Sequence, residues 1–392
     1  WRQAWADLCN AKFAEKDLRH MARGGREKQD QATRNRLVAA ALLAAACPLL
    51  AMLFSQPSLQ AILFPGYRRL SELLMSALAT ATSVAPFAIW DWLTAGLVVA
   101  AFTTLVRRIR RHRRMLPWFS VVALVVAATA LLGTAGWALN HYAPELSQDL
   151  GLEVGQYSED QLADATSYYL NQAASRAQLV PREEDGTLSH QDFYELARIA
   201  GASYAPLSQR YEVFSGSTAP VKSLLLFGEP LLYSGHTGIF WAATAESSVP
   251  LHTAIAELPF TMCHEAAHRL GIASEQEANF SAFLACSASD DVRFSYSGYY
   301  SAFNYCVNAL LAQDPERAQQ LVSDALAGAN GAGVALVLKD RAATQKHYQA
   351  FEGPFEDVGT TVNDTYLKSF GEKDGVRSYG LVVDYLLAWL DE

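Results

Sequence analysis

The sequence predicts a mainly helical α+β domain that follows three transmembrane helices. Two observations carry this prediction: three long apolar stretches lie within the first 138 residues of the 392-residue chain, and the later residues show many helical patterns but few strand-like runs. Uncharged stretches of about 18 or more residues are typical of membrane spans, and mixed helical and strand patterns are typical of a folded α+β domain. We therefore expect a membrane domain over residues 37–138 and a separate domain over residues 139–392.

The charged residues divide at the same boundary. Residues 1–138 contain 17 Lys and Arg against 7 Asp and Glu, whereas residues 139–392 contain 14 against 33, so the two parts carry net charges of +10 and −19. The acidic second part excludes a nucleic-acid partner. The five cysteines form no CxxC pair, which excludes a thiolate zinc ribbon, although Cys286 and Cys306 could pair outside the cell.

The first apolar stretch covers residues 37–54 and contains eighteen residues without a charge. This length is just enough to cross a hydrocarbon core of about 30 Å. Two further stretches follow at about residues 84–106 and 118–138; the alternative for each of the three is a helix buried in a protein core. The basic segment RRIRRHRR at residues 107–114 favours membrane spans, because such segments lie in cytoplasmic loops.

The same rule sets the expected orientation. Residues 1–36 form a second basic segment, so both basic segments are expected in the cytoplasm. With three spans, the acidic domain over residues 139–392 would then lie outside the cytoplasm. The expected partner of the first part is the lipid bilayer.

Residues 64–83, between the first two spans, have apolar residues at near-helical spacing, with Arg68, Arg69 and Glu72 on the other side. This pattern predicts a helix on the membrane surface or, as an alternative, a helix packed on the external domain. Asp91 lies near the start of the second span, beside two tryptophans. It could be a functional intramembrane acid or a residue at the membrane interface.

The predicted external domain has few strand-like runs. Residues 223–227 and 238–245 are expected to form strands, and most of residues 157–200 and 255–392 is expected to be helical.

The most informative motif is HExxH, formed by His264, Glu265 and His268. Pro259 suits the first turn of a helix and Gly271 suits a left-handed residue at its end, so a helix of about three turns is predicted between them. On such a helix two histidines at i and i+4 share one face, as a Zn²⁺ ion bound by two imidazoles requires. The alternative is a pair of hydrogen-bonded histidines in a packed core.

A third zinc ligand is expected on the following helix. Ser274 and Glu277 have the S-x-x-E spacing of a capping box, which gives Glu277 a structural role and leaves Glu275 as the expected ligand. Asn279, one turn after Glu275, could hydrogen-bond a ligand histidine. The spacing of another zinc-enzyme class, HExxHxxGxx and then a ligand, would select Ser274, which is a poor zinc donor.

With this motif the sequence resembles the gluzincin type of zincin metallopeptidase, in which HExxH is completed by a glutamate on the next helix. It is also similar to an uncharacterised bacterial family of membrane-anchored zinc-peptidase-like proteins with three spans. Two departures from the gluzincin pattern are the six residues between His268 and Glu275 and the asparagine at 279, where many relatives have aspartate. The residues that carry the second similarity are 235–247, 258–286, 294–305 and 362–380.

The resemblance implies a zincin-like fold and a zinc peptidase in the bacterial plasma membrane that hydrolyses peptide or protein substrates outside the cytoplasm. Glu265 would act as general base, and the segment GIFWAATAES at residues 238–247 would either pair with an extended peptide or be an ordinary core strand. The alternative function is a non-catalytic adaptor or sensor with a structural zinc site. The residue types that could stabilise an oxyanion occur at Tyr299, Tyr300, Tyr305, Arg293 and His236.

Overall fold

The computed structural model describes the chain except for residues 1, 354, 358, 362–364, 366–378 and 392. The chain divides into two compact units. The first unit contains residues 1–52 and 96–135, and the second contains residues 53–95 and 136–392. Residues 53–95, expected from the sequence to belong to the membrane domain, are thus grouped with the second unit.

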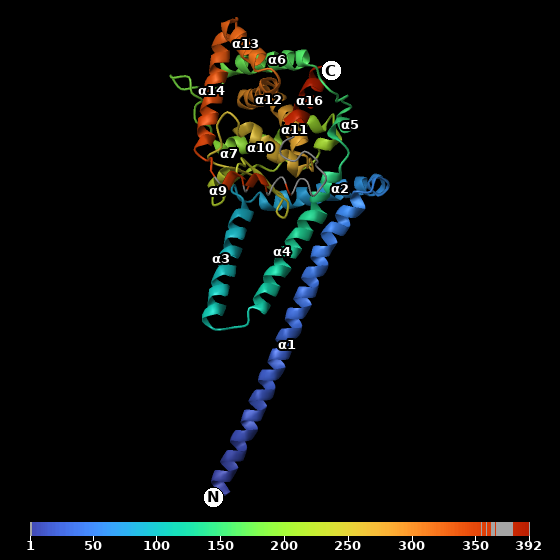
Figure 1. Cartoon of the computed structure of the whole chain (residues 1–392), viewed down its shortest axis with the longest axis vertical. Coiled ribbons are helices and arrows are strands. Elements are labelled where there is room, and N and C mark those ends of the chain that lie inside the picture. The colour runs from blue at the N-terminus through green and yellow to red at the C-terminus, as the bar shows by residue number, and fades with distance from the viewer. Residues whose placement is uncertain (1, 354, 358, 362–364, 366–378, 392) are drawn as a thin grey trace. The chain divides into compact units, whose positions relative to one another are not determined.

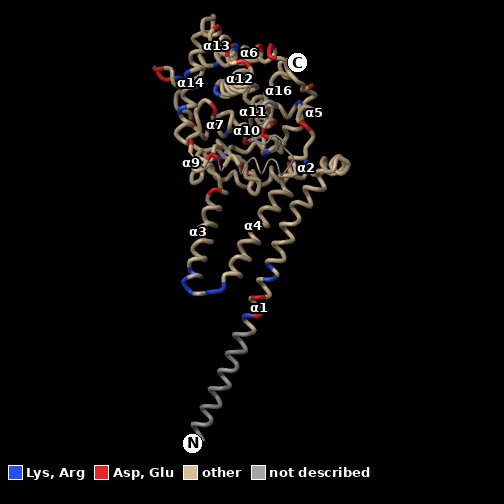
Figure 2. The backbone as a smooth tube through the Cα atoms, in the orientation of Figure 1, with Lys and Arg blue, Asp and Glu red and all other residues tan. Residues whose placement is uncertain are grey.

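The first unit is built from apolar helices. Three helices of the described chain are long and apolar enough to cross a membrane, namely residues Gly24–Phe54 of α1 (Arg2–Phe54), α3 (Ile89–Arg110) and α4 (Leu116–Gly136). This confirms the three predicted stretches as membrane-span candidates. Figure 2 shows that basic residues gather where α3 turns into α4. The second stretch begins five residues later than expected, because Ala88 N donates to Ser223 O at 3.0 Å in the second unit.

Helix α2 (Pro57–Thr82) belongs to the second unit and has two apolar faces. One face is buried, with Phe64, Tyr67 and Met75 among its residues. The other face is exposed: Ile62 is 74% exposed and Leu70 is 63% exposed. The predicted amphipathic helix is therefore present, and it packs on the second unit through only one of its faces.

Long helices form the body of the second unit. Helix α6 (Glu159–Ala177) packs on α12 (Val292–Gln313) and α14 (Gly331–Gln349) (Figure 1). Ser158 starts α6 with a complete capping box, and the fully buried Tyr169 and Tyr300 lie in the core. The remaining elements are η1 (Ala138–Tyr142), α5 (Leu146–Leu150), α7 (Phe193–Ala202), α8 (Ala205–Ser208), η2 (Glu212–Phe214), α9 (Gly228–Tyr233), α13 (Pro315–Ala327) and α16 (Tyr379–Leu390).

A small sheet lies beside these helices, with strand order β1-β3-β2. The strands are β1 (Lys222–Leu224), β2 (Ile239–Trp241) and β3 (Glu246–Pro250), and β3 pairs parallel with β1 and antiparallel with β2. The first two strands lie where the sequence predicted strands but are shorter. The third was not predicted, because its sequence ESSVP is polar although all five residues are buried.

Two carboxylates join the start of α3 to this sheet. Asp91 is fully buried and accepts the backbone N–H groups of Leu225, Leu226 and Phe227 at 2.9, 2.8 and 3.0 Å. These bonds turn the chain away and end β1 at Leu224. The carboxylate of Glu246 on β3 accepts the N–H groups of Ile89 and Trp90 at 2.8 and 3.0 Å, as acids at helix N-termini do.

The ring of Trp90 completes this sheet junction. It stacks on Trp241 of β2, with ring centroids 4.9 Å apart, and on Phe227 at 6.1 Å. Its Nε1 donates to Ser248 Oγ at 3.2 Å. The interfacial interpretation of Asp91 is too simple, because its carboxylate holds a turn of the second unit.

Candidate metal centre

Helix α10 (Leu258–Arg269) carries the HExxH motif and has the ends that the sequence predicts. Pro259 lies in its first turn, and Gly271 has a left-handed φ of 91°. Gly271 N donates to His268 O at 3.0 Å, and Ile272 N donates to Ala267 O at 3.2 Å, which is the pattern of a Schellman motif. This turn ends α10 sharply. It leads the chain back toward α10, so that only six residues separate His268 from Glu275.

Helix α11 (Glu275–Ser287) begins at the expected third ligand, but the predicted capping box is wrong. Ser274 is the N-cap residue, yet its side chain makes no capping hydrogen bond. The carboxylate of Glu277 accepts hydrogen bonds from Leu146 N at 2.7 Å and Tyr385 Oη at 3.1 Å. Glu277 is thus structural, as expected, but it connects α11 to distant elements.

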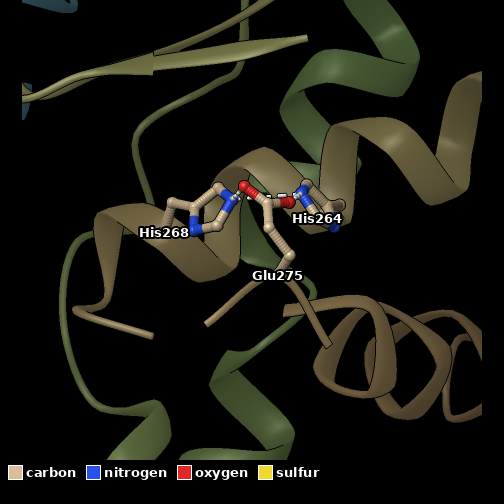
Figure 3. A group of neighbouring side chains, drawn as sticks. All are labelled: His264, His268 and Glu275. Atoms are coloured by element: carbon tan, nitrogen blue, oxygen red, sulfur yellow. Dashed lines mark hydrogen bonds and ion pairs between the residues drawn. The ribbon is translucent and has the colours of Figure 1, made fainter. Parts of the chain in front are cut away.

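The three expected ligands point toward one another (Figure 3). His264 Nε2 lies 3.0 Å from His268 Nε2 and 3.2 Å from Glu275 Oε2, and His268 Nε2 lies 3.7 Å from Glu275 Oε1. Ligands held about 2.0–2.1 Å from a tetrahedral Zn²⁺ lie about 3.3–3.4 Å from one another. The observed separations are close to that value, so the three donors fit one zinc ion without moving far.

Contacts around His268 fix the direction of its ring. Its Nδ1 lies 2.7 Å from Ile272 O, an arrangement that leaves Nε2 free for a metal. Trp137 Nε1 donates to His268 O at 2.7 Å, and the two rings meet edge to face at 6.1 Å. No hydrogen bond joins Asn279 to either histidine within the part of the chain that the structure describes, so its supporting role stays a prediction.

The charges at the site influence one another. Burial opposes ionisation of Glu275, but the two imidazoles lower its pKa well below the usual range. Burial also lowers the pKa of His268, and Glu275 more than compensates, so that the pKa of His268 is raised to about 9. Because a metal binds neutral imidazole, metal binding here would release a proton.

Glu265 lies in a different environment from the three candidate ligands. Its side chain is buried, and burial raises its pKa to about 7. Its Oε2 has no hydrogen-bond partner among the described residues. A buried carboxylate oxygen left in this way is costly, and such atoms mark places where a ligand or water completes the site.

The sheet places a backbone segment against Glu265. Gly238 directly precedes β2, and a side chain at this position would collide with the Glu265 carboxylate. Ser247 Oγ on β3 donates to Glu265 O at 2.6 Å, which fixes the sheet to α10. β2 is an edge strand of the sheet, and its start lies next to the candidate base.

Sequence reasoning missed Trp137, Gly238 and Ser247. Trp137 was assigned to the end of the third span, and its contact with His268 joins residues 131 positions apart. A glycine within a predicted strand is the one local feature that could have indicated Gly238, because such glycines often mark a close backbone approach. Nothing in the local pattern indicates Ser247.

Three of the residues predicted as oxyanion stabilisers make other contacts in the structure. Arg293 forms ion pairs with Asp291 and Glu195 at 2.6 and 3.0 Å, and Tyr300 Oη donates to Thr344 Oγ1 at 3.2 Å. His236 Nδ1 lies 3.1 Å from Ser234 Oγ. The thiols of Cys286 and Cys306 are both free and buried, so they form no disulfide. Most of the segment 362–380 lies outside the described residues.

Comparison with known proteins gives one match. Residues 67–387 match the family described as "Protein of unknown function (DUF3810)". No curated protein and no solved structure matches the chain. The family description contains no activity, so the resemblance to gluzincins stays a prediction.

Proposed function

The chain belongs to this DUF3810 family, and we propose that it is a membrane-anchored zinc-dependent peptidase. The single observation that carries this proposal is the grouping of three donors at zinc spacing beside a buried carboxylate with a free oxygen. His264, His268 and Glu275 would hold the ion, and a fourth position would stay open. Glu265 would not bind the ion.

Zn²⁺ held by these residues would lower the pKa of a bound water to about 7 and polarise a carbonyl oxygen. Glu265 would accept a proton from the attacking water and donate it to the leaving amine of the cleaved peptide bond. Burial, which raises the pKa of Glu265, favours this carboxylate as a proton acceptor. Burial of this side chain keeps competing water away from the proton transfer.

An extended peptide would pair with the outer edge of β2. Edge strands present backbone N–H and C=O groups that can bind a further strand. β2 starts beside Glu265, so a peptide paired with β2 would pass the candidate base. In this proposal the basic residues between α3 and α4 face the cytoplasm of a bacterium, and the second unit faces outward from the plasma membrane.

The proposal is tested with the full chain purified in detergent. We expect one zinc ion per chain by elemental analysis and cleavage of a peptide library that a chelator stops and added zinc restores. The Glu265→Gln variant should keep its zinc and lose about 10²–10⁴-fold in cleavage rate. The matched control is Glu229→Gln, at an exposed position on α9, which should cleave at the normal rate.

Two outcomes would contradict the peptidase. A chain without zinc would remove its chemical basis. If the Glu265→Gln variant keeps both its zinc and its biological activity, the adaptor with a structural zinc site is favoured instead. Such a site needs no general base.

A further inference from the structure

One face of α2 is both apolar and exposed. Its exposed apolar residues include Ile62, Leu70 and Leu73, which are 74, 63 and 61% exposed. At about 100° per residue their mean direction is roughly 170° from that of the buried face, and Arg69 and Glu72 lie on one flank between the two faces. A soluble surface rarely presents such a stripe, whereas a helix lying in a lipid interface does. Helix α2 also follows the apolar end of α1 after two residues.

The buried face of α2 leads directly to the end of the ligand helix. Ser71 Oγ donates to Gly136 O at 2.8 Å, and Asn140 Nδ2 donates to Ser71 Oγ at 3.2 Å. The Asn140 side chain in turn packs against Gly271, where a Cβ would lie 3.3 Å from it. One layer of side chains therefore separates α2 from the turn that follows His268.

The ligand His268 and the edge strand β2 each contact a tryptophan at the end of an apolar helix. Trp137, which contacts His268, is the first residue after α4. Trp90, which stacks on Trp241 of the edge strand β2, is the second residue of α3. Chain continuity alone thus keeps the ligands and the edge strand close to the points where the chain enters membrane-span candidates.

We propose that the site acts on polypeptide segments at the lipid boundary, which means the juxtamembrane stretch of a membrane-anchored substrate, while the exposed face of α2 lies in the lipid. This inference rests on the peptidase proposed above and adds its substrate class. The width of one helix, about 10–12 Å, sets the distance between the lipid and the site. An extended chain covers this distance in about three to five residues, at roughly 3.3 Å per residue.

The test uses the full chain in vesicles of phosphatidylethanolamine and phosphatidylglycerol. The substrate has one transmembrane anchor followed by several copies of a cleavable sequence found in the library, and mass spectrometry identifies which copy is cut. All copies share one anchor, so each is present in equal number at the membrane and the preference reports how far from the lipid the site cuts. We expect the copy within about six residues of the lipid to be cut at least about fivefold more often than copies beyond about twenty residues.

Variants test the contribution of α2. The double variant Ile62→Glu, Leu73→Glu places charges in the proposed lipid surface, and the ratio of near to distant cuts should fall at least about fivefold. The matched control is Leu326→Glu on α13, where the leucine is 45% exposed and has no place in this proposal, so the ratio should stay unchanged. Cleavage of soluble library peptides at the normal rate shows that each variant is folded.

The outcomes separate the two proposals. Equal cutting of all copies, preferential cutting of distant copies, or an unchanged ratio in the α2 double variant would overturn the boundary inference and leave the peptidase intact. A wild-type chain that binds no zinc and cuts neither anchored nor soluble peptides would overturn the peptidase and this inference together.

Discussion

The ligand helices and the small sheet meet at the candidate site but are held in different ways. The donors on α10 and α11 come from one stretch of twelve residues, His264 to Glu275, and the turn at Gly271 brings them together. The sheet depends on residues far away in the sequence: Asp91 holds residues 134 to 136 positions further on.

This difference teaches that the candidate metal ligands and the edge strand have separate structural sources. The donor geometry follows from two helices and one turn, whereas the edge strand depends on a junction with the start of α3. We therefore expect changes in the first region to remove zinc and changes in the second to weaken the fold around β2 while zinc binding persists.

The largest effect is expected for His268→Ala, which removes one of three donors. Zinc affinity should fall at least about 1,000-fold, because loss of an outer partner alone typically costs 10–100-fold. Competition with a chelator of known affinity measures this change. His252→Ala, at an exposed histidine in the loop before α10, is the control and should bind zinc normally. Normal zinc binding by His268→Ala would show that the ion lies elsewhere.

The Asp91→Asn variant tests the other side of the comparison. Both oxygens of the Asp91 carboxylate accept hydrogen bonds, and an asparagine has only one such oxygen. Its NH₂ group would face at least one of the three backbone N–H donors. We expect a loss of about 2–4 kcal/mol and a thermal midpoint lower by roughly 5–10 °C. Zinc per folded chain should not change. Asp164→Asn, at an exposed position on α6, should have a normal midpoint. Loss of zinc in Asp91→Asn would argue that the two regions are not independent.

A pH dependence of stability sharpens the comparison at the start of α10. Burial raises the pKa of Glu257 to about 7, against about 4.5 for an exposed glutamate. As pH rises from 4.5 to 7, the unfolded chain loses this proton before the folded chain does, so the folded state loses stability over this window.

The Glu257→Gln variant should remove that dependence, which we expect to be about 2 kcal/mol between pH 5 and pH 8 because the group is only partly buried. Thermal midpoints at the two pH values measure it. Glu229→Gln is the control. The difference between its thermal midpoints at pH 5 and pH 8 should equal that of the wild-type chain. An unaltered difference in Glu257→Gln would assign the pH dependence to other groups.

The smallest effect is expected for Trp137→Phe, which keeps the aromatic ring but removes the donor to His268 O. Zinc affinity should fall by about tenfold, the lower end of the range for outer partners. Trp118→Phe is the control, because it loses an indole hydrogen bond to Thr104 in the first unit. Equal zinc affinity in the two variants would show that the Trp137 bond does not tune the site.

The sequence predicted most of the ligand region because its information is local. HExxH, the proline before it and Gly271 lie within a few turns of one helix, and the third donor follows directly. The capping box failed because Glu277 is occupied by Leu146 and Tyr385, which no local pattern reveals. Only two of the three strands were predicted, for a related reason: β3 is polar, and its burial comes from α10 and from contacts with the start of α3.

The junction at Asp91 has a consequence for the side chains of the turn that it holds. Its carboxylate binds three main-chain N–H groups and makes no demand on the side chains at those positions. Two of them, Leu225 and Leu226, are 42 and 40% exposed. The turn therefore tolerates other side chains at these two positions while the three bonds to the carboxylate stay in place.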